Sequence, residues 1–154
     1  MLWIGRLDHC RKSERRNRVS EMMSEQISYY LGAIRRGDKG EENAIHRLVE
    51  LGDEVIPFLS ASFATETNPD VRATLLRVAR MTNAPASLSL FAQALEDWSP
   101  TVWKGALDGL VAAANSEALL IAQHGKGRAD AQKGEWIDEA IDQIQEAMRP
   151  TTGD

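Results

Sequence analysis

A five-residue motif that occurs twice constrains the fold of this chain more than any other feature. Asn68-Pro69-Asp70-Val71-Arg72 returns further along the chain as Ser99-Pro100-Thr101-Val102-Trp103. Asparagine and serine are good N-cap residues, because their side-chain oxygens accept a backbone N–H of the first helical turn. A proline is tolerated at the next position, where no N–H is needed. Each copy follows one apolar stretch and opens another, so the motif predicts a repeated pair of helices.

Apolar residues recur at helical spacing after both copies of the motif, which predicts a buried stripe along each helix. The helices that precede the motifs also correspond, because the candidate N-caps Asp53, Asn83 and Asn115 have a mean spacing equal to the interval between Asn68 and Ser99. No alternating, strand-like run with hairpin turns interrupts the pattern, so the sequence predicts an all-α fold. The stripe residues are Val71, Leu75, Val78 and Ala79 in the first helix and Val102, Ala106, Leu107, Leu110 and Val111 in the second.

These residues resemble HEAT repeats, and in particular the short bacterial HEAT-like units first described in phycobilisome lyases. The resemblance covers residues 41–121, about half of the chain. The first motif copy carries it best, since the family favours Asp or Asn, then Pro, then Val-Arg at the start of the second helix. The second copy departs from this pattern at Trp103. Ankyrin and tetratricopeptide repeats fit less well, because their turn and aromatic patterns are absent.

The resemblance implies an α-α superhelix, which is a HEAT-like solenoid of stacked antiparallel helix pairs. The alternative is an ordinary helical bundle that contains two similar hairpins. Short connections separate the expected helices, as is usual for antiparallel neighbours. We expect the solenoid over residues 22–149 and a frayed C-terminus over residues 150–154, with a polar loop at 125–130 and a closing helix whose polar outer face suits a terminal cap. Helices are predicted at about residues 22–36, 41–51, 53–66, 69–82, 84–96, 100–114, 116–124 and 131–148.

Charge is distributed unevenly along the chain. The net charge of −5 combines a net +4 over residues 1–20, which hold six basic and two acidic side chains, with a net −9 over the remainder. An acidic body repels nucleic acid and favours basic partners. Residues 1–21 are predicted to be a disordered basic leader, with a nucleic-acid arm, a transit peptide and an upstream extension of the reading frame as alternatives.

Composition and motifs argue against several classes of site. Cys10 is the only cysteine, so no internal disulfide forms, and an intracellular, cytoplasmic protein is expected. No apolar run approaches the ~20 residues that a membrane helix needs, so no membrane partner is expected. No metal-ligand spacing, phosphate-binding loop, paired catalytic carboxylates or nucleophile elbow is visible, so we predict no metal, no cofactor and no catalytic residue. The weak candidates are His9, His46, His124 and Gly125-Lys126-Gly127-Arg128.

Tryptophans mark candidate packing and binding positions. Trp98 lies at a turn between helices and Trp136 lies in an apolar stripe, so both are expected in the core. Trp103 stands where the resemblance expects an arginine, at a position that often lines the inner surface of the solenoid. Because Trp and Arg dominate interface hot spots, Trp103 is either a binding anchor or a core residue.

The predicted function is that of a non-catalytic scaffold, which holds another protein on a concave face formed by the second helix of each pair. Its contact residues are expected to lie off the buried stripe of those helices. The resemblance also gives Arg72 a structural alternative, namely a bond to a turn carboxylate of a neighbouring repeat. The candidate contact residues are Arg72, Arg77, Trp103, Lys104 and Asp108.

Three other functions remain open. A bacterial immunity protein that neutralises a basic toxin is suggested by the small, acidic body of the chain. A chromophore lyase-like subunit is suggested by the resemblance alone, which is a weak argument because a fold does not determine a function. A DNA-binding HEAT-like protein needs a basic cleft, and the acidity of the repeats argues against that reading.

Overall fold

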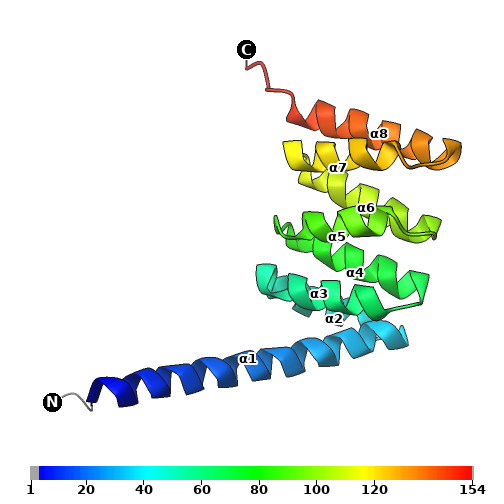
Figure 1. Cartoon of the computed structure of the whole chain (residues 1–154). Helices are drawn as coiled ribbons and strands as arrows, with labels where there is room; N and C mark the ends of the chain where they lie inside the picture. Colours follow the sequence, from blue (N-terminus) through cyan, green and yellow to red (C-terminus); the bar gives the residue numbers. More distant parts are fainter. Residues whose placement is uncertain (1–3, 154) are drawn as a thin grey trace. The chain divides into compact units, whose positions relative to one another are not determined.

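The computed structural model describes the backbone of residues 4–153 and the side chains of residues 10–153, and this part of the chain is all-helical (Figure 1). The predicted fold class, all-α with packed helices, is thereby confirmed. The chain divides into an N-terminal unit, residues 1–44, and a C-terminal unit, residues 45–154. The boundary falls inside helix α2 (Glu41–Glu50), and the two units are described separately below.

The N-terminal unit is dominated by one long helix, α1 (Ile4–Arg36). The sequence prediction began this helix at residue 22 and expected disorder before it, whereas the structure is helical from residue 4. Arg, Glu, Lys and Met are good helix formers, and no proline interrupts residues 4–36, so the chain has no local reason to leave the helix there. The first three residues of the predicted leader lie outside the described range.

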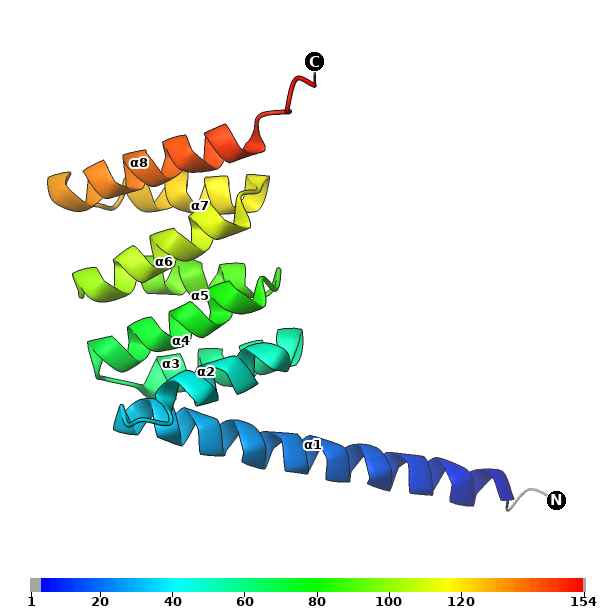
Figure 2. The same ribbon diagram turned by 180° about the vertical axis from the view of Figure 1, so that it is seen from behind.

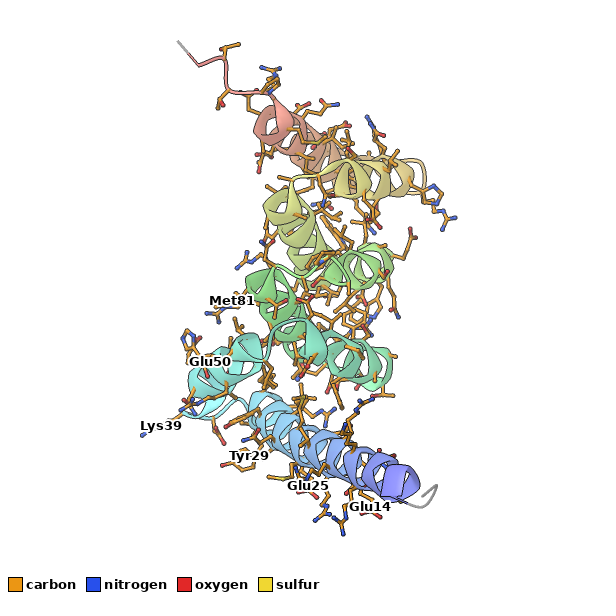
Figure 3. The ribbon with its side chains drawn as sticks, turned by 90° about the vertical axis from the view of Figure 1, so that its left-hand side faces the viewer. Glu14, Glu25, Tyr29, Lys39, Glu50 and Met81 are labelled. Atoms are coloured by element: carbon orange, nitrogen blue, oxygen red, sulfur yellow. The ribbon has the colours of Figure 1, made fainter. Side chains whose placement is uncertain are left out.

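Side-chain burial separates α1 into two halves. The described side chains before Met23 are all exposed, whereas Ile27, Leu31, Ala33 and Ile34 are buried. Figure 3 shows side chains such as Glu14, Glu25 and Tyr29 projecting from the helix surface. The helix ends at Gly37, whose φ of +61° is the left-handed conformation that glycine adopts at little cost.

The C-terminal unit contains the helices that the repeat pattern predicted. Two of them, α4 and α8, have the predicted bounds, because capping residues set both helix starts. The segment before α3 is a separate 3₁₀ turn, and α5 begins at Ser87 rather than at the expected position 84. The elements after α2 are η1 (Gly52–Val55), α3 (Ile56–Thr65), α4 (Pro69–Thr82), α5 (Ser87–Leu95), α6 (Pro100–Ala113), α7 (Ser116–Lys126) and α8 (Ala131–Met148).

The helices of this unit pack in two rows (Figures 1 and 2). Helix α4 contacts α6, and α6 contacts α8, so these three helices form one row. Helix α5 contacts α7 in the second row, and the successive helices α3 and α4, α5 and α6, and α7 and α8 also contact each other. Apolar side chains fill the space between the rows, and the largest fully buried ones include Phe63, Leu75, Leu90, Leu110 and Ile137.

The two copies of the motif start α4 and α6 with different capping contacts. Asn68 behaves as predicted, since its Oδ1 accepts the N–H of Asp70 at 2.9 Å. Ser99 occupies the N-cap position but makes no side-chain capping bond. Instead, its own N–H donates to Oδ1 of Asp97 at 2.9 Å, so a carboxylate in the preceding turn fixes the entry to α6.

The helix ends repeat more faithfully than the predicted N-caps do. Asn115 caps α7 as predicted, because its Oδ1 accepts the N–H of Ala118 at 2.8 Å. The prediction for Asp53 is wrong, because this residue lies inside η1. Asn83 is also not an N-cap: it ends α4 in the left-handed conformation, with φ of 52°. Ala114 ends α6 in the same conformation, with φ of 48°, and it follows Asn83 by the interval that separates the two motif copies.

Candidate partner-binding face

The five candidate contact residues all lie on one row of helices. Arg72 and Arg77 belong to α4, and Trp103, Lys104 and Asp108 belong to α6. Their burial differs, because Arg77 and Asp108 are exposed, Arg72 and Lys104 are partly buried, and Trp103 is buried. The five candidates therefore share one row, but only some of them are accessible at its surface.

Arg72 is held by three groups of the fold itself. Its Nη2 forms an ion pair with Oδ2 of Asp97 at 2.7 Å, and its Nη1 donates to the carbonyl oxygen of Glu66 at 3.1 Å. The guanidinium also stacks on the ring of Phe63, 4.0 Å from the centroid. The side chain of Asp97 is only 4% exposed and that of Arg72 is 21% exposed. The structural alternative therefore applies to Arg72, which ties the start of α4 to the turn between α5 and α6.

Trp103 occupies the position of Arg72 in the next helix pair and is 6% exposed. The expectation that it lies off the buried stripe is wrong, because its ring packs at the junction of α6 and α8. Lys104 and Lys133 each place Nζ 5.6 Å from the ring centroid. Lys133 also donates a hydrogen bond to the carbonyl oxygen of Leu95, so a lysine from α8 covers this tryptophan. Both positions therefore make cation–π contacts, but with the roles exchanged. Arg72 supplies the cation and Phe63 the ring in one pair, whereas Trp103 supplies the ring and Lys104 and Lys133 the cations in the next.

Trp136 on α8 is the aromatic side chain that this row presents to solvent. It was expected in the core, but it is 45% exposed. Its ring meets that of Trp103 edge to face, with centroids 6.4 Å apart and an angle of 71° between the planes. Nζ of Lys104 lies 4.1 Å from its centroid, within the range of a cation–π contact. The ring is therefore held in place by its inner edge while part of its surface remains open.

A signal for this exposure exists in the sequence. On a helix, the residues three and seven positions after Trp136 lie on its side, and these are Glu139 and Gln143. The fully buried members of the stripe, Ile137 and Ile144, lie about 100° or more around the helix from that polar line. Trp136 is thus an edge residue of the stripe.

A groove of about 220 Å³ runs beside Trp136 between α6 and α8. Leu107, Val111 and Ala140 give it an apolar lining, while charged and amide side chains surround them. Small-molecule sites commonly occupy ~300–1,000 Å³, so this groove is smaller than most of them. The groove includes two of the predicted contact residues. The polar residues that line it are Lys104, Asp108, Glu139 and Gln143.

Asp108 and Arg80 extend the charged edge of this row. Their side chains form an ion pair of 3.9 Å between α6 and α4, and Asp108 is 66% exposed. An exposed pair of this length contributes little to stability, so both groups remain able to exchange partners. We call the row α4–α6–α8 with the groove beside Trp136 the Trp136 face.

Two further cavities of about 240 Å³ lie elsewhere in the C-terminal unit. One is at the ends of α4 and α6 around Asn83 and Asn115, and the other lies between α5 and α7 around Leu120 and His124. Neither is lined by a tryptophan.

Trp98 was expected in the core, but it lies in the turn between α5 and α6 and is 79% exposed. It does not line the groove and provides an internal comparison for Trp136.

No group of three or more His, Cys, Asp or Glu within the residues described is placed to hold a metal ion. The pKa of Asp38 is lowered from 3.8, chiefly because its carboxylate accepts the N–H of Gly40 and also because Arg36 donates to it. Asp38 is exposed and belongs to the turn after α1.

None of the helices between residues 4 and 153 has both the length and the apolar character needed to cross a bilayer.

Known proteins offer no direct guide to this face. Comparison of the chain with protein-family models, with curated proteins and with solved structures finds no match.

Proposed function

We propose that this protein is a non-catalytic interaction module of the cytoplasm, a HEAT-like α-solenoid that binds a partner protein on its Trp136 face. The two-row packing of α3–α8 supports the solenoid, because a solenoid needs each helix pair to contact its neighbours in order. The left-handed helix ends at Asn83 and Ala114 support it as well, because their spacing equals that of the motif copies. The concave surface of such a stack is formed by the second helices, which here are α4, α6 and α8.

The observation that carries the proposal is the half-exposed ring of Trp136 beside the groove. Tryptophan is enriched at interface hot spots, and a hot spot needs an anchor that is ordered before binding. Trp103 and Lys104 provide that order through the edge-to-face and cation–π contacts. The mixed lining of the groove, with an apolar centre and charged edges, also matches the composition of partner interfaces.

The test compares two exposed tryptophans. A pull-down from the native host with mass spectrometry identifies the partner, and calorimetric titration then measures its affinity for the purified chain. Trp136→Ala is expected to weaken binding by about 2 kcal/mol, which is about 30-fold in Kd. Trp98→Ala is expected to leave Kd unchanged, because Trp98 does not line the groove. Equal losses for the two variants, or none for Trp136→Ala, would remove the basis for this face.

An immunity protein that neutralises a basic toxin is a second proposal, supported by the outer surface of α8. Five exposed carboxylates follow one side of this helix. Like charges three or four residues apart on a helix destabilise it by about 0.2–0.5 kcal/mol per pair, so a basic partner would relieve this repulsion. Lys126 pairs with Asp138 and Arg149 pairs with Glu146, so part of the charge is balanced locally. The carboxylates are Glu135, Asp138, Glu139, Asp142 and Glu146.

This second proposal makes a distinct prediction about salt. A basic toxin captured by the acidic surface should associate many-fold more slowly when the ionic strength rises from about 0.01 to about 0.15 M, because screening shortens the reach of the field. Stopped-flow association of the captured partner measures this rate. A rate that does not depend on salt favours the scaffold and rejects electrostatic capture.

A further inference from the structure

The N-terminal half of α1 is an exposed helix that carries a concentrated positive charge. Every described side chain from Cys10 to Met22 is exposed, so this segment contributes nothing visible to a hydrophobic core. With about 3.6 residues per turn, its five cations fall within roughly half of the helix circumference. The opposite half carries Ser13, Glu14, Asn17, Ser20 and Glu21. The cations are Arg11, Lys12, Arg15, Arg16 and Arg18.

The described side chains do not neutralise these cations. Within the part of the chain that the structure describes, no side-chain hydrogen bond or ion pair engages any of the five, and Glu14 interacts instead with Sγ of Cys10 at 3.9 Å. Arg11 and Arg15, and likewise Lys12 and Arg16, lie four residues apart, where like charges repel on a helix. A helix of this kind gains stability when a polyanion supplies the missing counter-charge.

We propose that residues 10–22 of α1 bind the phosphate backbone of a nucleic acid. This activity is separate from the Trp136 face, which belongs to the other unit of the chain. Four of the five cations are arginines, whose planar guanidinium matches phosphate oxygens with two parallel N–H donors. A helix about 10–12 Å across also fits the major groove of a duplex, which is about 12 Å wide.

The distribution of apolar side chains favours a nucleic acid over a membrane. A helix that lies in a bilayer surface needs a continuous apolar face opposite its polar one. Here the exposed apolar residues, Val19 and Met22, lie within the basic half of the helix, and the other half is polar. Phosphate contacts along an extended backbone need no such apolar face.

The number of cations sets the expected salt dependence. They extend over about 10 Å of the helix axis, a span along which a duplex presents several phosphates. Each neutralised phosphate contributes about −0.9 to the slope of log K against log salt for a duplex. Five contacts therefore predict a slope of about −4.5 for the full chain.

The experiment measures fluorescence anisotropy of a short labelled DNA duplex with the full chain between about 50 and 200 mM salt. The variant Arg11→Gln/Arg15→Gln/Arg18→Gln should bind at least tenfold more weakly at the lower salt, with a slope near −2. Its helicity should persist, because glutamine and arginine have similar helix propensities, and circular dichroism checks this. The matched control, Lys39→Gln/Arg47→Gln/Arg149→Gln, removes the same charge from exposed positions elsewhere and should bind like the unmodified chain.

Three results would overturn the proposal. The first is no binding of the full chain to the duplex or to a single-stranded oligonucleotide at the lower salt. The second is an equal loss in the control variant, which would mean that net charge rather than this helix is responsible. The third is tighter binding to mixed phosphatidylcholine and phosphatidylserine vesicles than to the duplex, which would assign the basic half to a membrane surface.

Discussion

The ion pair between Arg72 and Asp97 provides the sharpest test of how the helix pairs are joined. Asp97→Asn removes the charge but keeps an oxygen that can accept the N–H of Ser99, so the entry to α6 is preserved. What is lost is the counter-charge for Arg72, whose Nη2 lies 2.7 Å from the carboxylate. The remaining bond from Nη1 to the carbonyl of Glu66 cannot replace a full negative charge.

The expected cost follows from burial. Breaking one side of a buried ion pair costs about 3–5 kcal/mol, because the other charge is left without compensation. Arg72 retains 21% exposure, so solvent offsets part of that penalty and a value of about 3 kcal/mol is expected for Asp97→Asn. For a chain of 154 residues this corresponds to a fall in Tm of about 6–12 °C.

Urea denaturation followed by circular dichroism measures the change in the free energy of unfolding. The control is Glu50→Gln, since Arg47 and Glu50 form an ion pair of 3.2 Å with side chains 55% and 64% exposed. That substitution should cost less than about 0.5 kcal/mol. Arg72→Met keeps an apolar stem near Phe63, and combining it with Asp97→Asn should reveal a coupling energy of at least about 1.5 kcal/mol. A coupling below about 0.5 kcal/mol would show that this contact does not hold the helix pairs together.

Three further predictions concern the packing of α6. Trp103→Ala should lower the free energy of unfolding by about 3–5 kcal/mol in urea denaturation, as expected for a buried aromatic; a loss below about 1 kcal/mol would contradict its placement in the core. Gly109→Ala should cost about 1–3 kcal/mol, because an added Cβ would lie 2.5 Å from the ring of Phe91. In Gly105→Ala on the same helix, the added Cβ would meet only Leu76, at 3.5 Å, so this substitution should raise the free energy of unfolding by about 0.5–1 kcal/mol. Equal effects of Gly109→Ala and Gly105→Ala in thermal melts would contradict the close contact between Gly109 and Phe91. Ala114→Gly should raise stability by about 0.5–1 kcal/mol, because glycine adopts the left-handed φ of 48° without the strain that alanine carries there. Ala112→Gly, inside the helix, should lower stability by about 1 kcal/mol, so thermal melts of the two variants should shift in opposite directions.

Features determined by neighbouring residues could be predicted from the sequence. The start of α4 depends on the side chain of Asn68 and the ring of Pro69, which act within one turn, and its predicted bounds agree with the structure. The cap of α7 by Asn115 is local for the same reason. Such interactions need no knowledge of the rest of the fold, so pattern and propensity are sufficient.

Features that depend on contacts between helices were predicted poorly. The sequence predicts a core position for Trp98 from its turn and for Trp136 from its apolar stripe, and it leaves Trp103 open between the core and a binding surface. Their burial is decided by contacts with other helices: residues of α8 cover Trp103, whereas Trp103 and Lys104 of α6 contact Trp136 and leave it 45% exposed. Asn83 was assigned to the start of a helix because asparagine favours both N-caps and the left-handed conformation, and the sequence alone does not separate the two roles.

The matched ends of α4 and α6 bear on how a gene of this kind can grow or shrink. Joining Asn68 directly to Pro100 would remove one complete helix pair and recreate an asparagine–proline helix start at the seam. Duplication of the same stretch would likewise insert one pair with its own entry and exit. A single-codon deletion inside one of these helices would instead rotate the side chains that follow it by about 100° and turn their apolar positions outward. The coding sequence is thus expected to tolerate change in whole increments, so that the length of the exposed face varies in steps.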